Sequence, residues 1–563
     1  MEIHCAEVSH TTFFAPLARL RQPGMPVCVI VSGMADGDVT SEIMVRLRVG
    51  ISGHRTVTAG LPGLTGEIAK AVEYISQKLA VSADIPLTVV SSLAEGADRI
   101  VAEAVLGREG ARLEAVLPLP PGEYRTDFAN DQSWADFSRL LARDDRYDVV
   151  RTAASREHAY ELAGRAVVDR SDVMIIVWDG EPSRGRGGTA EIHEYALRWH
   201  RPVVLIHVTA DQARLVTEQL PYAAEGTLPL SAAYKRRLDQ FNREPATAHG
   251  TPEPAPLLAQ ASALPWLAAA EPMIEHIHRY YVRADQVAGR QQKWFRQVNR
   301  LLYVMAPLAV LIVAGQVVFA PGRRYLAWFE FGVLAVLTVL HLLARRAGWH
   351  TRWISARYLA EQLRSQTFLG LTGILTVDIA DGRGNSDSEV SWTERAAAEV
   401  WLTRPRFDPP GESSLLVDVL YQHWIKQQQD YHRDTSDKYK RRGAVFAATS
   451  VGLFTASAAA ALLHSLGVGG TAARPFKWWD FLAIAIPAVA GALSGYAAQR
   501  DYSRHAERSR LFARFLDRAL DRLLAARDLD GIQQAALAIS RSMRDEATEW
   551  YSAVHTQVLE LPT

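Results

Sequence analysis

Four apolar segments of about 20 residues each lie in the second half of this 563-residue chain. They are Leu301–Ala320, Tyr325–Ala344, Gly443–Leu463 and Phe481–Ala498. A helix of that length crosses the ~30 Å hydrocarbon layer of a bilayer, and it satisfies every backbone polar group within itself. We therefore expect four transmembrane helices. The alternative is a pair of buried core hairpins in a soluble domain.

Basic residues gather on one side of these segments. The first pair is preceded by Arg290, Lys293, Arg296 and Arg300 and followed by Arg345, Arg346 and Arg352, whereas its connecting loop has Arg323 and Arg324. The second pair is flanked by Lys438, Lys440, Arg441, Arg442, Arg500, Arg504 and Arg508, against Arg474 and Lys477 in its loop. Because Lys and Arg are retained on the cytoplasmic side, we expect both chain termini in the cytoplasm.

The overall composition excludes some classes of partner. The 62 Lys and Arg residues balance 62 Asp and Glu residues, so the bulk charge does not call for nucleic acid. The two cysteines, Cys5 and Cys28, exclude a disulfide framework and a Cys-rich metal site, and they fit a reducing compartment. The segment from Met1 to Leu20 has no apolar core of signal-peptide length. We expect no metal and no cofactor.

Residues 45–208 alternate short apolar runs with amphipathic stretches. Predicted strands are Val45–Ile51, Leu87–Ser91, Leu113–Leu119, Tyr147–Arg151, Val173–Trp178 and Val203–Val208. Predicted helices are Leu64–Leu79, Ala97–Leu106, Trp134–Ala142, Glu157–Val168 and Thr189–Trp199. This alternation predicts a doubly wound, Rossmann-like α/β domain with a parallel sheet covered on both faces.

Three loops at the carboxyl ends of the predicted strands carry the candidate ligand-binding residues, because ligands bind at this edge of such sheets. The first loop contributes Gly50, Gly53, His54 and Arg55, and the second contributes Ser91, Ser92, Glu95, Gly96, Asp98 and Arg99. The third contributes Asp179, Gly187, Gly188, Thr189 and Glu191 at the start of a helix. Glycines, hydroxyls and a helix N-terminus are typical of phosphate binding. The alternatives are a tight turn at Arg55 and helix capping by Ser92 or Asp98.

These loops resemble the SLOG superfamily of Rossmann-like domains, which includes DprA-type and LOG-type proteins. The resemblance covers roughly residues 45–210 and rests on Gly50-Ile-Ser-Gly-His-Arg, Leu93-Ala-Glu-Gly-Ala-Asp-Arg and Ser171-Asp-Val-Met-Ile-Ile-Val-Trp-Asp with Gly187-Gly-Thr-Ala-Glu. It implies a nucleotide-derived ligand. LOG-type hydrolases place a glutamate three residues after the loop threonine, whereas this chain has Ile192 there and Glu191 one position earlier. Arg184 and Arg186 replace a proline and a glycine of that pattern.

The paired apolar segments are similar to SLATT-type two-span modules, which are fused to nucleotide sensors in bacterial conflict systems. That similarity implies a homo-oligomeric membrane effector in the bacterial inner membrane, with a role in antiviral defence. The first rival is a membrane-tethered nucleotide N-glycosidase using Glu191 or Glu194 with Arg99. The second is a constitutive channel or transporter.

The expected organisation follows from these segments and from two linkers rich in Pro, Ala, Gly and Ser. It comprises an extension (1–44), the SLOG-like domain (45–210), a linker with helices (211–285), a first two-span module (286–366), a linker (367–412) and a second module with C-terminal helices (413–563). Candidate residues within the spans are Glu330, as a shallow acid, and Gly491 and Gly495, at a spacing that favours close helix packing.

Overall fold

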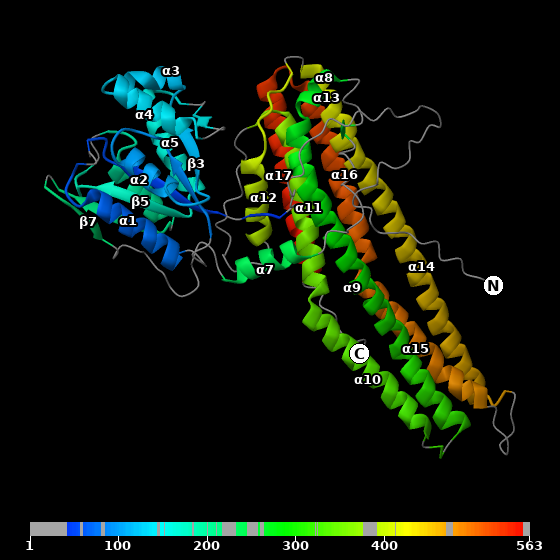
Figure 1. Ribbon diagram of the computed structural model, residues 1–563. Helices are drawn as coiled ribbons and strands as arrows, with labels where there is room; N and C mark the ends of the chain where they lie inside the picture. The colour runs from blue at the N-terminus through cyan, green and yellow to red at the C-terminus, as the bar shows by residue number, and fades with distance from the viewer. Residues whose placement is uncertain are drawn as a thin grey trace, which may run out of the picture. The chain divides into compact units, whose positions relative to one another are not determined.

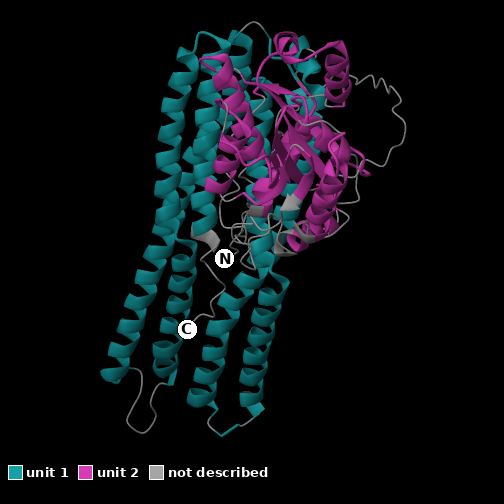
Figure 2. Cartoon of the chain, turned by 90° about the vertical axis from the view of Figure 1, so that its left-hand side faces the viewer, with its two compact units in different colours: residues 1–40, 245–373, 407–563 teal, residues 41–244, 374–406 magenta. Residues whose placement is uncertain are grey.

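The computed structural model describes residues 42–44, 46–56, 60–79, 85–143, 147–150, 153–182, 185–199, 201–209, 211–216, 232–244, 257–258, 264–320, 322–323, 325–374, 391–410, 413–468 and 477–555. Its compact units are discontinuous in sequence (Figure 2). One, the α/β unit, comprises residues 41–244 and 374–406. The other, the helical unit, comprises residues 1–40, 245–373 and 407–563.

The α/β unit is built on a seven-stranded sheet with the order β4-β3-β2-β1-β5-β6-β7. Figure 1 labels β3, β5 and β7 of this sheet. Its strands are β1 (Leu47–Gly53), β2 (Leu87–Ser91), β3 (Arg112–Leu117), β4 (Asp148–Val149), β5 (Val173–Trp178), β6 (Val203–Val208) and β7 (Ala213–Val216). All pairings are parallel except that of β6 with β7. The predicted doubly wound α/β fold is confirmed, and β7 is an edge strand that the sequence pattern missed.

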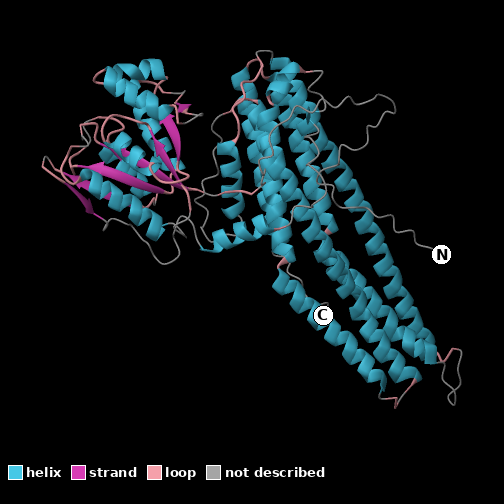
Figure 3. Cartoon of the chain, in the orientation of Figure 1, coloured by secondary structure: helices cyan, strands magenta, loops and turns pink. Residues whose placement is uncertain are grey.

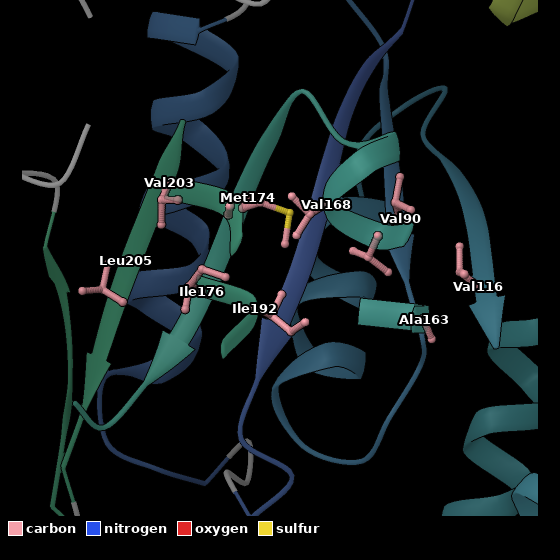
Figure 4. Close-up of a cluster of buried hydrophobic side chains, with 11 residues drawn as sticks. Val90, Val116, Ala163, Val168, Met174, Ile176, Ile192, Val203 and Leu205 are labelled. Carbon is pink, nitrogen blue, oxygen red and sulfur yellow. The ribbon is translucent and has the colours of Figure 1, made fainter. Parts of the chain in front are cut away.

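Helices cover both faces of this sheet, as Figure 3 shows by element type. Those that contact the strands are α1 (Leu64–Tyr74, continued by a π-helical turn to Leu79), α2 (Ala97–Leu106), α5 (Arg156–Arg170) and α6 (Thr189–Arg198). The unit also contains α3 (Pro121–Tyr124), α4 (Asp131–Leu141) and α7 (Ala232–Arg243). Helices α5 and α6 pack on one face, over a core that includes Met174, Ile176 and Ile192 (Figure 4). Right-handed crossovers place α1 and α2 on the opposite face.

A helix from the middle of the membrane half belongs to the α/β unit. Residues 367–412 were expected to be a linker, but they contain α12 (Ser391–Thr403), whose Trp392 contacts Phe241 of α7. Arg395 of α12 makes a two-pronged ion pair with Asp172 at the start of β5, with Nη1 2.7 Å from Oδ1. The segment that joins the two-span modules is therefore clamped to the sheet.

The helical unit contains two similar series of helices. The first is α9 (Glu271–Phe319), α10 (Tyr325–Ala347) and α11 (Trp349–Leu371). The second is α14 (Lys426–Ser465), α15 (Lys477–Arg500) and α16 (Tyr502–Ala525), preceded by α13 (Ser413–Leu420) and followed by α17 (Leu529–His555). A left-handed residue separates the last two helices of each series: Gly348 with φ +60° and Asp501 with φ +39°. The architecture therefore supports a duplicated unit.

Four stretches among the described residues are long and apolar enough to cross a membrane, and they lie in α9, in α10 with α11, in α14, and in α15 with α16. Large apolar side chains such as Trp328, Phe331 and Val451 stay exposed on them. In a bilayer these side chains would contact lipid, so their apolar surface would not be exposed to water. These helices fit a multi-pass membrane protein, in agreement with the sequence prediction.

Candidate ligand-binding site

The sheet order reverses at β1, because β2, β3 and β4 extend to one side of it and β5, β6 and β7 to the other. Ligands of doubly wound sheets bind at the carboxyl ends of the strands beside such a switch point. A pocket of about 500 Å³ opens at this place, lined by residues from 51–56, 92–98, 124–127, 156–164 and 178–192. Its volume lies within the range usual for small-molecule sites.

Two glycines bring the first loop against the start of α2. A Cβ atom on Gly53 would lie 2.5 Å from the Cβ of Ala97. Gly96 has φ +82°, and a Cβ there would lie 2.5 Å from the carbonyl oxygens of both His54 and Arg55. The N–H of Ala97 donates to the carbonyl of His54 at 3.2 Å. Only glycine fits at Gly96, so the sequence specifies the shape of the pocket floor at this point.

The side chains of the first loop face the third. His54 Nε2 lies 2.8 Å from Asp179 Oδ1, beyond the end of β5. Burial opposes ionisation of Asp179, but hydrogen bonds from the Glu181 N–H and from His54 hold its pKa below the ordinary value. Arg55 is exposed, and its guanidinium carbon lies 5.0 Å from the ring centroid of Tyr160. A cationic group is thus held at the pocket, and among the described residues it forms no direct ion pair, although its charge acts on Asp98 and Glu95.

The second loop places a buried carboxyl group in the pocket wall. Asp98 is 6% exposed, and burial raises its pKa to about 7. The Arg55 charge, the N–H groups of Ala94 and Gly53, and the Ser91 hydroxyl all oppose that rise. Leu93 is fully buried with φ +52°, a costly conformation for a branched residue. The loop is therefore strained and tightly packed around Asp98.

Glu95 and Arg99 hold the second loop in place instead of lining the pocket. Arg99 Nε donates to the Leu93 carbonyl at 3.1 Å, and its Nη1 donates to the Ser133 carbonyl at 2.8 Å. Glu95 accepts from the Ala129 N–H at 2.9 Å and from the Ser133 hydroxyl. The Arg99 guanidinium is therefore engaged in holding the second loop. Its position does not support the catalytic role that the N-glycosidase hypothesis gives it.

The third loop forms the start of α6. Gly187 has φ +78°, and a Cβ there would lie 2.6 Å from the Glu161 nitrogen. Its N–H donates to Glu191 Oε2 at 2.8 Å, so the Glu191 carboxylate folds back onto its own loop. Gly187, Gly188 and Thr189 line the pocket, and the first N–H groups of α6 have no acceptor within that helix. Ile192, at the hydrolase glutamate's position, packs in the sheet core (Figure 4).

Helix α3, the 3-10 turn that follows it (Arg125–Asp127) and helix α5 contribute pocket residues that the sequence analysis missed. They are Tyr124, Asp127, Arg156, Tyr160 and Gly164, joined by Arg186 and Trp178 from the third loop and β5. Arg156 pairs with Asp127, and Arg186 Nε lies 2.6 Å from Glu161 Oε2. Ser155 caps α5 by accepting from the His158 N–H. That cap signal was visible in the sequence, but nothing in it showed that α5 begins beside the switch point.

The remaining predicted residues lie elsewhere. Gly50 is inside β1, where a Cβ would lie 2.2 Å from Ser171 Oγ. Gly50 therefore allows close packing beside β1 and does not line the pocket. Glu194 is exposed and pairs with Arg198, and Arg184 lies outside the described residues. A Cβ on Gly495 of α15 would lie 3.5 Å from the Tyr303 ring of α9, whereas nothing lies within 4 Å of a Cβ on Gly491. Glu330 is half-buried near the start of α10.

The arrangement offers positive charge to a phosphate group. Arg55, Arg156 and Arg186 line the pocket, although Arg156 and Arg186 are paired with Asp127 and Glu161, and the α6 N-terminus adds its partial positive charge. Among the residues that the structure describes, no group of three or more His, Cys, Asp or Glu side chains is placed to hold a metal ion.

The fold and the pocket together define an α/β domain with a switch-point site, carried by a chain with four apolar helices. A family model described as a protein of unknown function (DUF4231) matches residues 279–373, from within α9 to just past the end of α11. This match covers most of the first helix series and none of the pocket. No curated protein matches the chain.

Proposed function

We propose that the α/β unit binds a nucleotide or a nucleotide-derived molecule and that occupancy of the pocket changes the packing of the membrane helices. The observation that carries this proposal is the pocket at the switch point, into which three separate loops bring Arg55, Ser92 and Thr189. The SLOG-like motifs support a nucleotide-derived ligand. Binding without turnover is favoured because the Glu191 carboxylate accepts a hydrogen bond from the Gly187 N–H of its own loop.

Phosphate recognition would be shared between side chains and backbone. The first turn of α6 offers N–H donors and a positive helix end to one phosphate. Arg55 reaches the same pocket from the loop that follows the neighbouring strand β1, and it can move from Tyr160 to an anion. A guanidinium pairs well with phosphate because its donors form a planar fork. The whole pocket has a volume of about 500 Å³, which leaves room for a base and sugar beside the phosphate.

Covalent connections supply the route from the pocket to the membrane helices. The chain passes between the two units at residues 40–41, 244–245, 373–374 and 406–407. Because α12 is clamped to Asp172 at the start of β5, movement of β5 would pull on the chain between α11 and α13. The ligand must bind the protein more tightly in one helix arrangement than in the other, since a ligand with equal affinity for both would not change their populations.

The basic flanks of the apolar segments favour a cytoplasmic position for the α/β unit. The resemblance to SLATT-type modules supports the bacterial inner membrane as its place. The similarity to SLATT-type modules supports a homo-oligomeric effector in antiviral defence.

Calorimetry on the full-length chain in lipid nanodiscs tests the binding step. A shortened chain ending before α12 would lose the Arg395–Asp172 ion pair, so the whole chain is required. The ligands are nucleoside mono- and triphosphates, cyclic dinucleotides and ADP-ribose. Arg55→Ala should weaken binding about tenfold to a hundredfold, because a charge-assisted contact contributes about 1.5 to 3 kcal/mol.

The matched control is Lys70→Ala, since Lys70 is an exposed cation on α1 that does not line the pocket. It should bind like the wild type. The proposal fails if the folded protein binds none of these ligands, or if both variants lose affinity equally.

A further inference from the structure

A second, smaller cavity lies inside the helical unit. It has a volume of about 120 Å³ and is lined by residues of α9, α11, α14, α15, α16 and α17. Its walls include Asn299, Tyr439 and Gln499, and each of these residues lies within a few positions of the end of an apolar span. His350, at the start of α11 and just beyond α10, lies in the same wall and marks the end of the remaining span. The cavity therefore lies where all four spans end on their basic side.

Four arginines line this cavity, and two of them have acidic partners. Arg357 Nη1 lies 2.9 Å from Asp285 Oδ1, and Arg508 Nη2 lies 3.0 Å from Glu546 Oε1. Burial raises the pKa of Glu546 to about 7 even beside Arg508, so this carboxyl supplies only part of a negative charge at neutral pH. The lining is therefore cationic.

Arg296 and Arg500 form no ion pair with an acid in the part of the chain that the structure describes. Arg500 donates to the Tyr496 hydroxyl at 3.3 Å, and Arg296 donates to the Gln292 amide oxygen at 2.9 Å once that amide is turned toward the donor. Both partners are neutral. The Nε–H groups of Arg296, Arg500 and Arg508 are buried without an acceptor. Two half-buried guanidinium groups around one cavity repel each other unless an anion lies between them.

We propose that this cavity binds a phosphate group between Arg296 and Arg500. A site of about 120 Å³ is smaller than the pockets that hold whole nucleotides, so it fits a single tetrahedral oxyanion. The phosphate of an anionic lipid and free inorganic phosphate share this chemistry, and both are available at the cytoplasmic surface of a bilayer. The binding would lock together helices from both series, and it does not depend on the pocket of the α/β unit.

The test measures thermal unfolding of the full-length chain in three kinds of nanodisc. The arms are phosphatidylcholine alone, phosphatidylcholine with inorganic phosphate, and phosphatidylglycerol. Stabilisation by inorganic phosphate identifies the free ion, whereas stabilisation by phosphatidylglycerol alone identifies the lipid phosphate. In either case Arg296→Gln and Arg500→Gln should raise at least tenfold the concentration of inorganic phosphate or of phosphatidylglycerol that gives half of the maximal stabilisation, as expected for loss of a charged hydrogen bond.

Two further comparisons guard against a general loss of structure. Lys293→Gln removes an exposed cation of α9 that does not line the cavity, and it should behave like the wild type. Arg500→Gln in phosphatidylcholine without added inorganic phosphate, where the choline balances the charge of the lipid phosphate, should melt at or above the wild-type temperature, because it removes like-charge repulsion. The proposal is overturned if neither phosphate source stabilises the wild type, or if both stabilise the Arg296 and Arg500 variants as much as the wild type.

Discussion

Asp98 is buried in the wall of the candidate ligand-binding pocket, and this burial raises its pKa toward neutrality. Its pKa is about 7 in the folded chain, against an ordinary value of 3.8. A folded state with the higher pKa binds the proton more tightly, so the stability that Asp98 contributes is complete below about pH 4 and is lost as the pH rises through 7. The loss is on the order of a few kcal/mol.

Asp98→Asn removes this titration while it keeps the shape of the side chain. We expect the wild-type melting temperature to fall relative to that of the variant as the pH rises from about 4 to about 8. Melting curves of both proteins across that range make the comparison. A difference that stays constant with pH would show that Asp98 is ionised throughout.

Glu191 supports the loop that would hold phosphate, and it is not free to attack a glycosidic bond. Its Oε2 accepts from the Gly187 N–H at 2.8 Å, and the neighbouring Ile192 occupies the hydrolase glutamate's position in the motif. Incubation of the wild type with nucleoside monophosphates should therefore release no free base, as measured by chromatography. Base release that disappears in Glu191→Gln would establish the N-glycosidase instead.

The helix α12 ties the membrane half of the chain to the sheet through one main ion pair. Arg395→Ala leaves Asp172, which is 9% exposed, without its cation, and removing one partner of such a pair typically costs about 3 kcal/mol. The melting temperature of the α/β unit should fall accordingly. In a double-mutant cycle with Asp172→Asn, the coupling should exceed about 1 kcal/mol. Additive effects of the two substitutions would mean that the pair contributes no interaction energy.

Helices α15 and α9 pack closely at Gly495 and not at Gly491. A Cβ on Gly495 lies 3.5 Å from Tyr303, so Gly495→Leu should push the two helices apart and lower the melting temperature in nanodiscs. Gly491→Leu points into open space within the chain and should leave stability unchanged. If Gly491→Leu is the more harmful substitution, this face packs against a second copy of the chain.

Local patterns predicted the α/β elements because the strands are short, buried and rich in β-branched residues. The predicted bounds of β2, β5, β6 and α2 agree with the structure. Long-range placement was not predictable. The ionic partners of α12 are Asp172 and Arg48, more than 200 residues earlier, and no local periodicity records such a contact. For the same reason, Arg156 and Tyr160 could be assigned to a helix but not to the pocket.

Two linked units explain how binding energy in one part of the molecule could reach another. The chain crosses between the α/β unit and the helical unit at four points, so the sheet is connected to both helix series. A constitutive channel would not need this connectivity. A sensor would need it, because the ligand acts only through its different affinities for two arrangements.

Ligand-dependent leakage of dye from proteoliposomes tests this coupling most directly. The nucleotide selected by calorimetry is titrated against the wild type, Arg55→Ala and the control Lys70→Ala. We predict that Arg55→Ala inserts normally but needs at least a tenfold higher ligand concentration for half-maximal leakage, as expected for loss of a charged phosphate contact, while Lys70→Ala matches the wild type. Leakage of the Arg55→Ala liposomes at the wild-type ligand concentration, or leakage without ligand, would contradict the sensor account and favour a constitutive channel.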